Sequence, residues 1–145
     1  MRLPTPLGGN DNLFVTLPTL NDTGSSAQTL FRNDLRQMGF IETPATFYPG
    51  SYSQGILGSI PITTANGTVR RMALITENRV VKPDGTAMTG WYWEIAIVDD
   101  YPAPATTRLS GENLRTQLYL ATAPGNHGLF ASQKRGGITR LLPTV

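Results

Sequence analysis

The sequence has no cysteine, a single histidine and only two lysines among its 145 residues. Without cysteine there is no disulfide, no thiol nucleophile and no cysteine-based metal site. With His127 as the only histidine, a metal site built from several histidines is also excluded, although a Ser-His-Asp triad needs only one. The redox compartment stays open, since a protein without cysteine is compatible with any compartment.

Charged residues are also scarce, at 15 % of the chain, with ten Asp and Glu against twelve Lys and Arg. The net charge of +2 is too small to indicate a nucleic-acid groove. Nearly all of the basic residues are arginine, which is enriched at protein interfaces where lysine is depleted. The composition therefore favours a protein packed against neighbouring subunits over a protein that binds nucleic acid.

The sequence shows neither a membrane-spanning pattern nor a secretory signal. No stretch approaches the ~20 apolar residues that a transmembrane helix needs. Residues 1–12 contain one arginine and two prolines but no apolar core, so they do not resemble a signal peptide. We therefore expect no membrane partner and no export of the chain.

Prolines and glycines divide the chain into two ends and a middle. The two prolines within residues 1–12 disfavour a helix, so this segment is predicted to form an extended N-terminal arm. A Gly-Gly pair opens residues 136–145, which are predicted to form a C-terminal tail. Residues 13–135 are predicted to form a single β-rich domain, because they are numerous enough to bury a core of their own.

Strand patterns dominate this middle region. The two longest lie at 69–81 and 90–100, and the turn residues Pro83-Asp84-Gly85 between them predict one long hairpin. A further strand is expected at 56–63, where Pro61 indicates a position at the sheet edge. The sequence Ala-Asn-Gly-Thr at 65–68 predicts a tight hairpin turn after it.

One segment has the pattern of a helix, at about 26–38. Ser25 or Ser26 can cap its beginning, and Gly39 can end it. Together these patterns predict a mainly β fold. We expect an antiparallel β-sandwich or partly closed β-barrel with one short helix and extended N- and C-terminal arms.

The stretch Thr-Gly-Trp-Tyr-Trp-Glu-Ile-Ala-Ile-Val-Asp-Asp-Tyr at 89–101 allows two interpretations. On a strand one face is an unbroken apolar row, which predicts that this row faces the core; it consists of Trp91, Trp93, Ile95 and Ile97. The alternative is a sugar platform with Glu94 and Asp99 as catalytic acids. These two acids point to opposite faces and lie about 16 Å apart on a strand, whereas glycosidase carboxylates lie within ~5–9.5 Å.

Other catalytic patterns are weak. His127 lies among glycines and asparagine, as expected for a solvated turn, although it could act as a base. Ser110 and Ser132 are candidate nucleophiles, but neither lies in a Gly-x-Ser-x-Gly elbow. The sequence contains no phosphate-binding loop and no calcium loop. We therefore expect no enzymatic activity, no cofactor and no bound metal.

Three features together resemble the structural proteins of tailed-bacteriophage particles, of the capsid decoration or cement kind. They are the arm Met-Arg-Leu-Pro-Thr-Pro-Leu-Gly-Gly-Asn-Asp-Asn, the β-rich body 56–122 and the tail Gly-Gly-Ile-Thr-Arg-Leu-Leu-Pro-Thr-Val. The resemblance covers the whole chain in style and includes no diagnostic motif. It implies a virion protein that forms trimers or dimers over the major capsid protein and clamps neighbouring capsid subunits.

The same resemblance implies that both ends contact partners. The residues expected to do so are Arg2, Leu3, Pro4, Leu7, Arg140, Leu141 and Leu142. A tail, baseplate or head–tail connector role is an open alternative. A second alternative is a carbohydrate-binding or receptor-binding β module, in which a glycan would contact Tyr48, Tyr52, Tyr92 and Tyr101.

Overall fold

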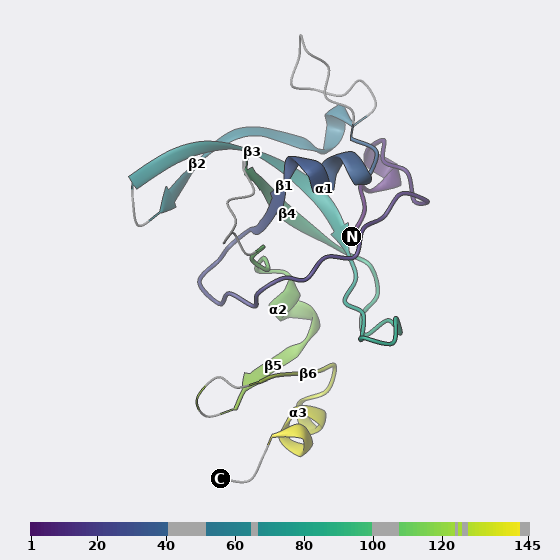
Figure 1. Cartoon of the computed structure of the whole chain (residues 1–145), viewed down its shortest axis with the longest axis vertical. Coiled ribbons are helices and arrows are strands. Elements are labelled where there is room, and N and C mark those ends of the chain that lie inside the picture. The colour runs from purple at the N-terminus through teal and green to yellow at the C-terminus, as the bar shows by residue number, and fades with distance from the viewer. Residues whose placement is uncertain (41–51, 65–66, 100–107, 124, 126–127, 143–145) are drawn as a thin grey trace.

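The computed structural model of the chain describes residues 1–40, 52–64, 67–99, 108–123, 125 and 128–142 (Figure 1). Within these residues the strands are β1 (Gln28–Phe31), β2 (Ile56–Thr64), β3 (Gly67–Asn78), β4 (Tyr92–Asp99), β5 (Tyr119–Thr122) and β6 (Leu129–Ser132). Its helices are short: η1 (Thr5–Leu7), α1 (Arg32–Gln37), η2 (Ser53–Gly55), α2 (Leu114–Gln117) and α3 (Arg135–Leu141). The prediction of a mainly β fold is confirmed.

A four-stranded sheet in the order β1-β4-β3-β2 forms the body of the molecule. The predicted long hairpin is present, because β3 and β4 pair antiparallel from Met72 opposite Val98 to Asn78 opposite Tyr92. β2 pairs antiparallel with β3 as far as Thr64 opposite Gly67, and β2 takes the edge position that Pro61 indicates. Residues 65–66 of the predicted turn lie outside the described residues. β1 runs parallel to β4, so the sheet is mixed rather than purely antiparallel.

The predicted helix at 26–38 is divided between a strand and a shorter helix. Residues Gln28–Phe31 form β1, because Leu30 fills the core at 0 % exposure while the backbone pairs with β4. α1 then begins at Arg32, where the Asp34 carboxylate accepts the backbone N–H of Phe31 at 3.0 Å. Gly39, at φ +83°, follows its end as predicted.

The core lies on one face of the four-stranded sheet, here called the inner face. α1 and the N-terminal segment pack on this face. The buried apolar side chains of this core are Leu3, Val15, Leu30, Leu35, Met38, Phe40, Tyr52, Met72, Leu74, Ala96 and Val98. Removing a buried leucine from such a core typically costs about 2–5 kcal/mol, so this face carries much of the stability.

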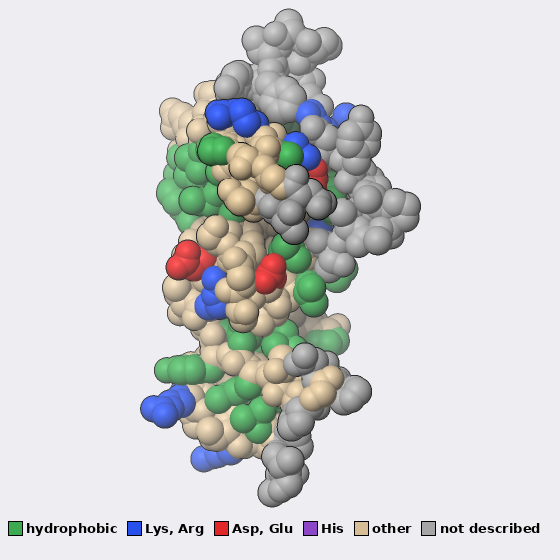
Figure 2. All heavy atoms as spheres, turned by 90° about the vertical axis from the view of Figure 1, so that its left-hand side faces the viewer, with side chains coloured by type: hydrophobic (Ala, Val, Ile, Leu, Met, Phe, Trp, Pro, Cys, Tyr) green, Lys and Arg blue, Asp and Glu red, His purple; other side chains and the backbone are tan. Residues whose placement is uncertain are grey.

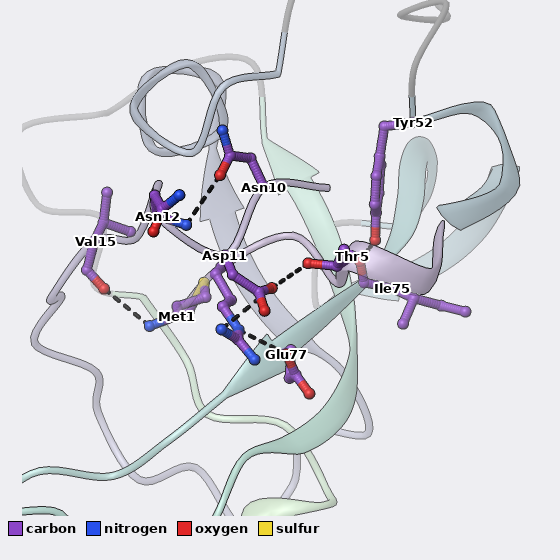
Figure 3. Close-up of polar contacts among 10 residues, drawn as sticks. Met1, Thr5, Asn10, Asp11, Asn12, Val15, Tyr52, Ile75 and Glu77 are labelled. Atoms are coloured by element: carbon purple, nitrogen blue, oxygen red, sulfur yellow. Dashed lines mark hydrogen bonds and ion pairs between the residues drawn. The ribbon is translucent and has the colours of Figure 1, made fainter. Parts of the chain in front are cut away.

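Residues 1–12 are packed onto the body and do not form an extended arm. Arg2 exchanges two backbone hydrogen bonds of 2.9 Å with Glu77, which continues the sheet edge beyond the end of β2. Leu3 is 2 % exposed, and Thr5–Leu7 form a turn of 3-10 helix. Figure 3 shows Met1, Asp11 and Glu77 gathered around this segment. The difference arises because the prolines block a long helix without preventing apolar neighbours from filling the core.

The predicted C-terminal tail is also folded in part. Residues Arg135–Leu141 form α3, whose residue Ile138 is 8 % exposed against the β5–β6 hairpin. The two-stranded sheet and α3 together are called the C-terminal lobe, residues 118–142. Figure 1 shows this lobe at one end of the molecule, joined to the body through α2. Among the described strands, none closes the four-stranded sheet into a barrel.

Candidate interaction surface

The face of the sheet opposite the core, here called the outer face, is apolar and only partly covered: Ala73 and Ile97 on it are buried, at 0 and 9 % exposure, whereas other residues are exposed. On β4 it carries Trp93, which is 47 % exposed, and Ile95, which is 42 % exposed. Ile95 lies directly opposite Ile75 of β3 in the strand register. Val69 on the same face of β3 is 36 % exposed and lies opposite Ile62 of β2. A sheet that is apolar on both faces is expected to be covered on both.

The prediction that the row Trp91, Trp93, Ile95 and Ile97 faces the core is wrong for Trp93 and Ile95, which are exposed, although Ile97 is buried at 9 % exposure. The structure instead turns Ala96 and Val98 of β4 toward the core, together with Glu94. The periodicity was correct, but both faces of this strand are apolar enough to be buried. Which face of β4 is turned toward the core depends on whether the Glu94 carboxylate has hydrogen-bond donors inside the protein.

Glu94 does find such partners. Its carboxylate accepts the backbone N–H of Ile95 at 3.2 Å and of Asn113 at 3.0 Å, and Leu114 at the start of α2 adds a third. Burial of the side chain, at 2 % exposure, raises the pKa of Glu94, while these hydrogen bonds act in the opposite direction. The buried carboxylate therefore holds α2 to the sheet.

The charged groups around the outer face are paired within the chain. Arg71 binds Asp99 through Nε and Oδ1 at 3.0 Å, at the end of the β3–β4 register. Arg2 binds Glu77 through Nε and Oε2 at 2.7 Å, opposite Trp93. Because each carboxylate has an arginine partner, the outer face has little net charge. It is suited to an apolar contact rather than to electrostatic recognition.

Trp91, the other tryptophan, has a different role. The guanidinium groups of Arg2 and Arg79 lie over its ring, at 4.2 and 4.7 Å from the centroid. Two such cation–π contacts stabilise the end of the sheet by about 0.5–2 kcal/mol each. Trp91 is therefore held by the N-terminal segment, and only Trp93 is presented on the outer face.

The candidate catalytic residues within the described part of the chain have structural partners. The Ser110 hydroxyl accepts the N–H of Asp22 at 3.2 Å, and the Ser132 hydroxyl accepts the N–H of Lys134 at 3.2 Å. Glu94 and Asp99 lie on opposite faces of β4, as predicted. No group of three or more His, Asp or Glu within the described residues is placed to hold a metal ion. His127, Tyr48 and Tyr101 lie outside the described residues.

The predicted partner-binding residues fall into two groups. The N-terminal group is inside the fold, since Leu3 and Pro4 are buried, Arg2 is paired and Leu7 packs against the core. The C-terminal group lies at the exposed end of α3, where Arg140 is accompanied by Leu141 at 50 % and Leu142 at 37 % exposure. Trp93 and Ile95 lie on the surface, contrary to the prediction from the sequence. One feature of the sequence could have indicated this: both faces of residues 92–98 are apolar, so either face could have been the exposed one.

No family model, no curated protein and no solved structure matches this chain. Within the described residues, no helix has the length and apolar character needed to cross a membrane. The functional argument therefore depends on the surface itself.

Proposed function

We propose that the chain is a non-enzymatic structural protein of a bacteriophage particle, and that its outer face packs against a neighbouring protein subunit. The observation that carries this proposal is the half-exposed apolar row of Trp93 and Ile95 on a sheet whose other face already holds the core. A second protein layer on this face would bury the row and supply the missing half of the packing.

The surroundings of the row favour a protein partner. On the outer face Trp93 is followed along β4 by Ile95, which pairs with Ile75, and Glu77 directly across from Trp93 is ion-paired with Arg2. A nucleic acid would require unpaired basic groups beside the aromatic ring. In this proposal the protein decorates the capsid and clamps adjoining subunits, and a tail, baseplate or connector position would use the same face.

The test is binding to purified virion particles of the phage that encodes the chain. The wild-type chain should appear in these particles at fixed stoichiometry by mass spectrometry. Added to particles that lack it, the chain should co-sediment with them, and Trp93→Asp should abolish co-sedimentation. Gln54→Asp, an exposed change outside the outer face, is the matched control and should bind normally. Absence of the chain from the particles would overturn the proposal.

The exposure of Trp93 also favours a second candidate, a glycan-binding module. A half-exposed indole on a flat sheet can stack against a sugar ring, and Glu77 lies across from it in the register. Two of the four predicted tyrosines do not support this role, because Tyr52 is 1 % exposed and Tyr92 lies on the inner face. Tryptophan fluorescence against a glycan panel, with Trp93→Phe as the comparison, decides between the two candidates. A fluorescence change that disappears in the variant would favour the glycan.

A further inference from the structure

The two-stranded sheet of the C-terminal lobe has free backbone groups along both edges. Its strands pair antiparallel from Tyr119 opposite Ser132, and the N–H of Ala123 donates to the carbonyl of Gly128 at 3.2 Å in the same register. Hydrogen-bonded and non-hydrogen-bonded pairs alternate along such a ladder. The backbone groups of every second residue therefore point away from the partner strand. These outward residues are Leu120 and Thr122 on β5 and Leu129 and Ala131 on β6.

No hydrogen bond from a described residue outside the hairpin reaches these outward groups. Unpaired backbone N–H and C=O groups are buried only at a large cost, so they face solvent, and no residue of either strand is buried. Figure 2 shows hydrophobic side chains exposed at the lower end of the molecule, where the lobe lies. A two-stranded hairpin is marginally stable by itself, and a third strand is the usual way to stabilise it. The lobe therefore gains stability from a further strand at one of its edges.

The edges of the four-stranded sheet are protected in ways that the hairpin is not. On β2, Pro61 has no N–H and the register with β3 shifts once. The Arg70 side chain also donates a hydrogen bond to the carbonyl of Ser59 on this strand. On β1, the N–H of Thr29 donates to the carbonyl of Leu109 at 3.1 Å. Charges, prolines and irregular register are the usual devices against pairing of edge strands. Because β5 and β6 contain no charged residue, no proline and no shift in register, their edges are suited to pair with another strand.

The edge of β6 is complementary to a second copy of itself. Its outward residues are two positions apart, so an antiparallel neighbour centred on Phe130 places Leu129 of each copy opposite Ala131 of the other. Each outward N–H then meets an outward carbonyl. The partly exposed Phe130 lies opposite its own counterpart, and such aromatic pairs stabilise neighbouring strands. The same arrangement of β5 would bring only Ala121 to the centre, so β6 is the better edge for self-pairing.

We infer that two copies of the chain associate through β6, and that their hairpins form one four-stranded sheet in the order β5-β6-β6-β5. The contact uses the same edge on both copies, so it closes as a two-fold dimer. Lys134 and Arg135 follow β6 directly, and the antiparallel arrangement keeps these cations of the two copies at opposite ends of the pair. The inference goes beyond the proposed function, because the edge of β6 is separate from the outer face.

The first experiment is light scattering behind a sizing column, across a broad range of protein concentration. Wild type should elute as a dimer that dissociates on dilution. Ala131→Pro removes an outward N–H but none of the hydrogen bonds between β5 and β6, so this variant should be monomeric. Thr122→Pro is the matched change on the outward edge of β5 and should dimerise like wild type. Circular dichroism checks that both variants are folded.

A second experiment keeps the inference testable if Ala131→Pro does not fold. The chain has no cysteine, so Phe130→Cys places a single thiol of each copy at the two-fold axis. Directly opposed residues of a non-hydrogen-bonded pair have Cα atoms about 4.5 Å apart, a separation that a disulfide can bridge. Under mild oxidation this variant should cross-link into dimers. Ala121→Cys, at the corresponding position of β5, is the control and should stay a single chain.

A wild-type chain that is monomeric at every concentration would overturn the β6 contact. Equal cross-linking of the two cysteine variants would overturn it too, as would dimers that Thr122→Pro abolishes and Ala131→Pro does not. Each of these results leaves the proposed function to be decided separately, by co-sedimentation of the same chain with particles.

Discussion

Asp34 and Arg108 form a two-point ion pair that ties the first turn of α1 to the chain beyond β4. Arg108 Nε donates to Asp34 Oδ2 and Nη2 donates to Oδ1, both at 2.8 Å. The same carboxylate accepts the N–H of Phe31, and the guanidinium lies 5.0 Å from the centroid of the Phe31 ring. The buried Asp34 carboxylate therefore caps α1 at the end of β1 and binds Arg108, which is 74 positions away in the sequence.

Breaking this pair should be costly. Asp34 is 1 % exposed and Arg108 is 24 % exposed, so Asp34→Asn should lower the free energy of unfolding by about 2–4 kcal/mol. Solvent around Arg108 keeps the loss below that of a fully buried pair. The matched control is Arg71→Gln, which breaks the pair with Asp99, where both side chains are about a third exposed, and should cost at most about 1 kcal/mol. Urea unfolding measures both, and equal losses would contradict this account.

Local patterns predicted the parts of the fold that depend on near neighbours. The β3–β4 hairpin, its turn and the edge position of Pro61 follow from residues close together in sequence. The pairing of Arg2 with Glu77, 75 residues apart, has no local signal. The same holds for Glu94, whose burial depends on the backbone of Asn113. The exposed face of β4 could not be predicted from local patterns, because the distant partners of Glu94 determine which face is buried.

The assignment of inner and outer faces gives a direct prediction. Leu74→Ala, on the inner face at 0 % exposure, should destabilise the protein by about 2–5 kcal/mol because it leaves a cavity. Ile95→Ala, on the outer face at 42 % exposure, should cost no more than about 1 kcal/mol in the separated chain. Chemical denaturation at a concentration where the chain is dissociated measures both. A larger loss from Ile95→Ala than from Leu74→Ala would mean that the faces are reversed.

We predict that position 111 must be glycine, because the Glu94 carboxylate lies directly against it. A Cβ at residue 111 would lie 2.3 Å from Glu94 Cδ and 2.5 Å from both carboxylate oxygens. Gly111→Ala must therefore displace the carboxylate from its backbone donors, which should cost about 1–3 kcal/mol.

The control for this prediction is Gly136→Ala in α3, where a Cβ meets nothing within 4 Å. That change should be neutral or stabilise the chain by up to about 1 kcal/mol, because alanine reduces the entropy of the unfolded state. Thermal unfolding of the two variants compares them under one condition. A neutral Gly111→Ala would show that Glu94 can move without loss.

Stability should fall at alkaline pH because of buried tyrosines. Burial, with a smaller contribution from the charge of Glu94, raises the pKa of Tyr92 to about 12. Burial also raises the pKa of Tyr52, whose hydroxyl donates to the carbonyl of Ile75. Above pH ~10 the unfolded chain loses these phenolic protons while the folded chain keeps them, so the folded state binds more protons. The free energy of unfolding must then decrease as the pH rises from about 10 toward 12.

Urea unfolding at a series of pH values from 8 to 11 measures this decrease. Tyr92→Phe removes one of the two groups, so its stability should fall less steeply with pH than that of wild type. Each group contributes at most about 1.4 kcal/mol per pH unit to the slope. Tyr119→Phe, at a residue that is 50 % exposed in β5, is the control and should leave the slope unchanged. If Tyr92→Phe has the same slope as wild type, the Tyr92 hydroxyl is not held in the protected environment that the inner face provides.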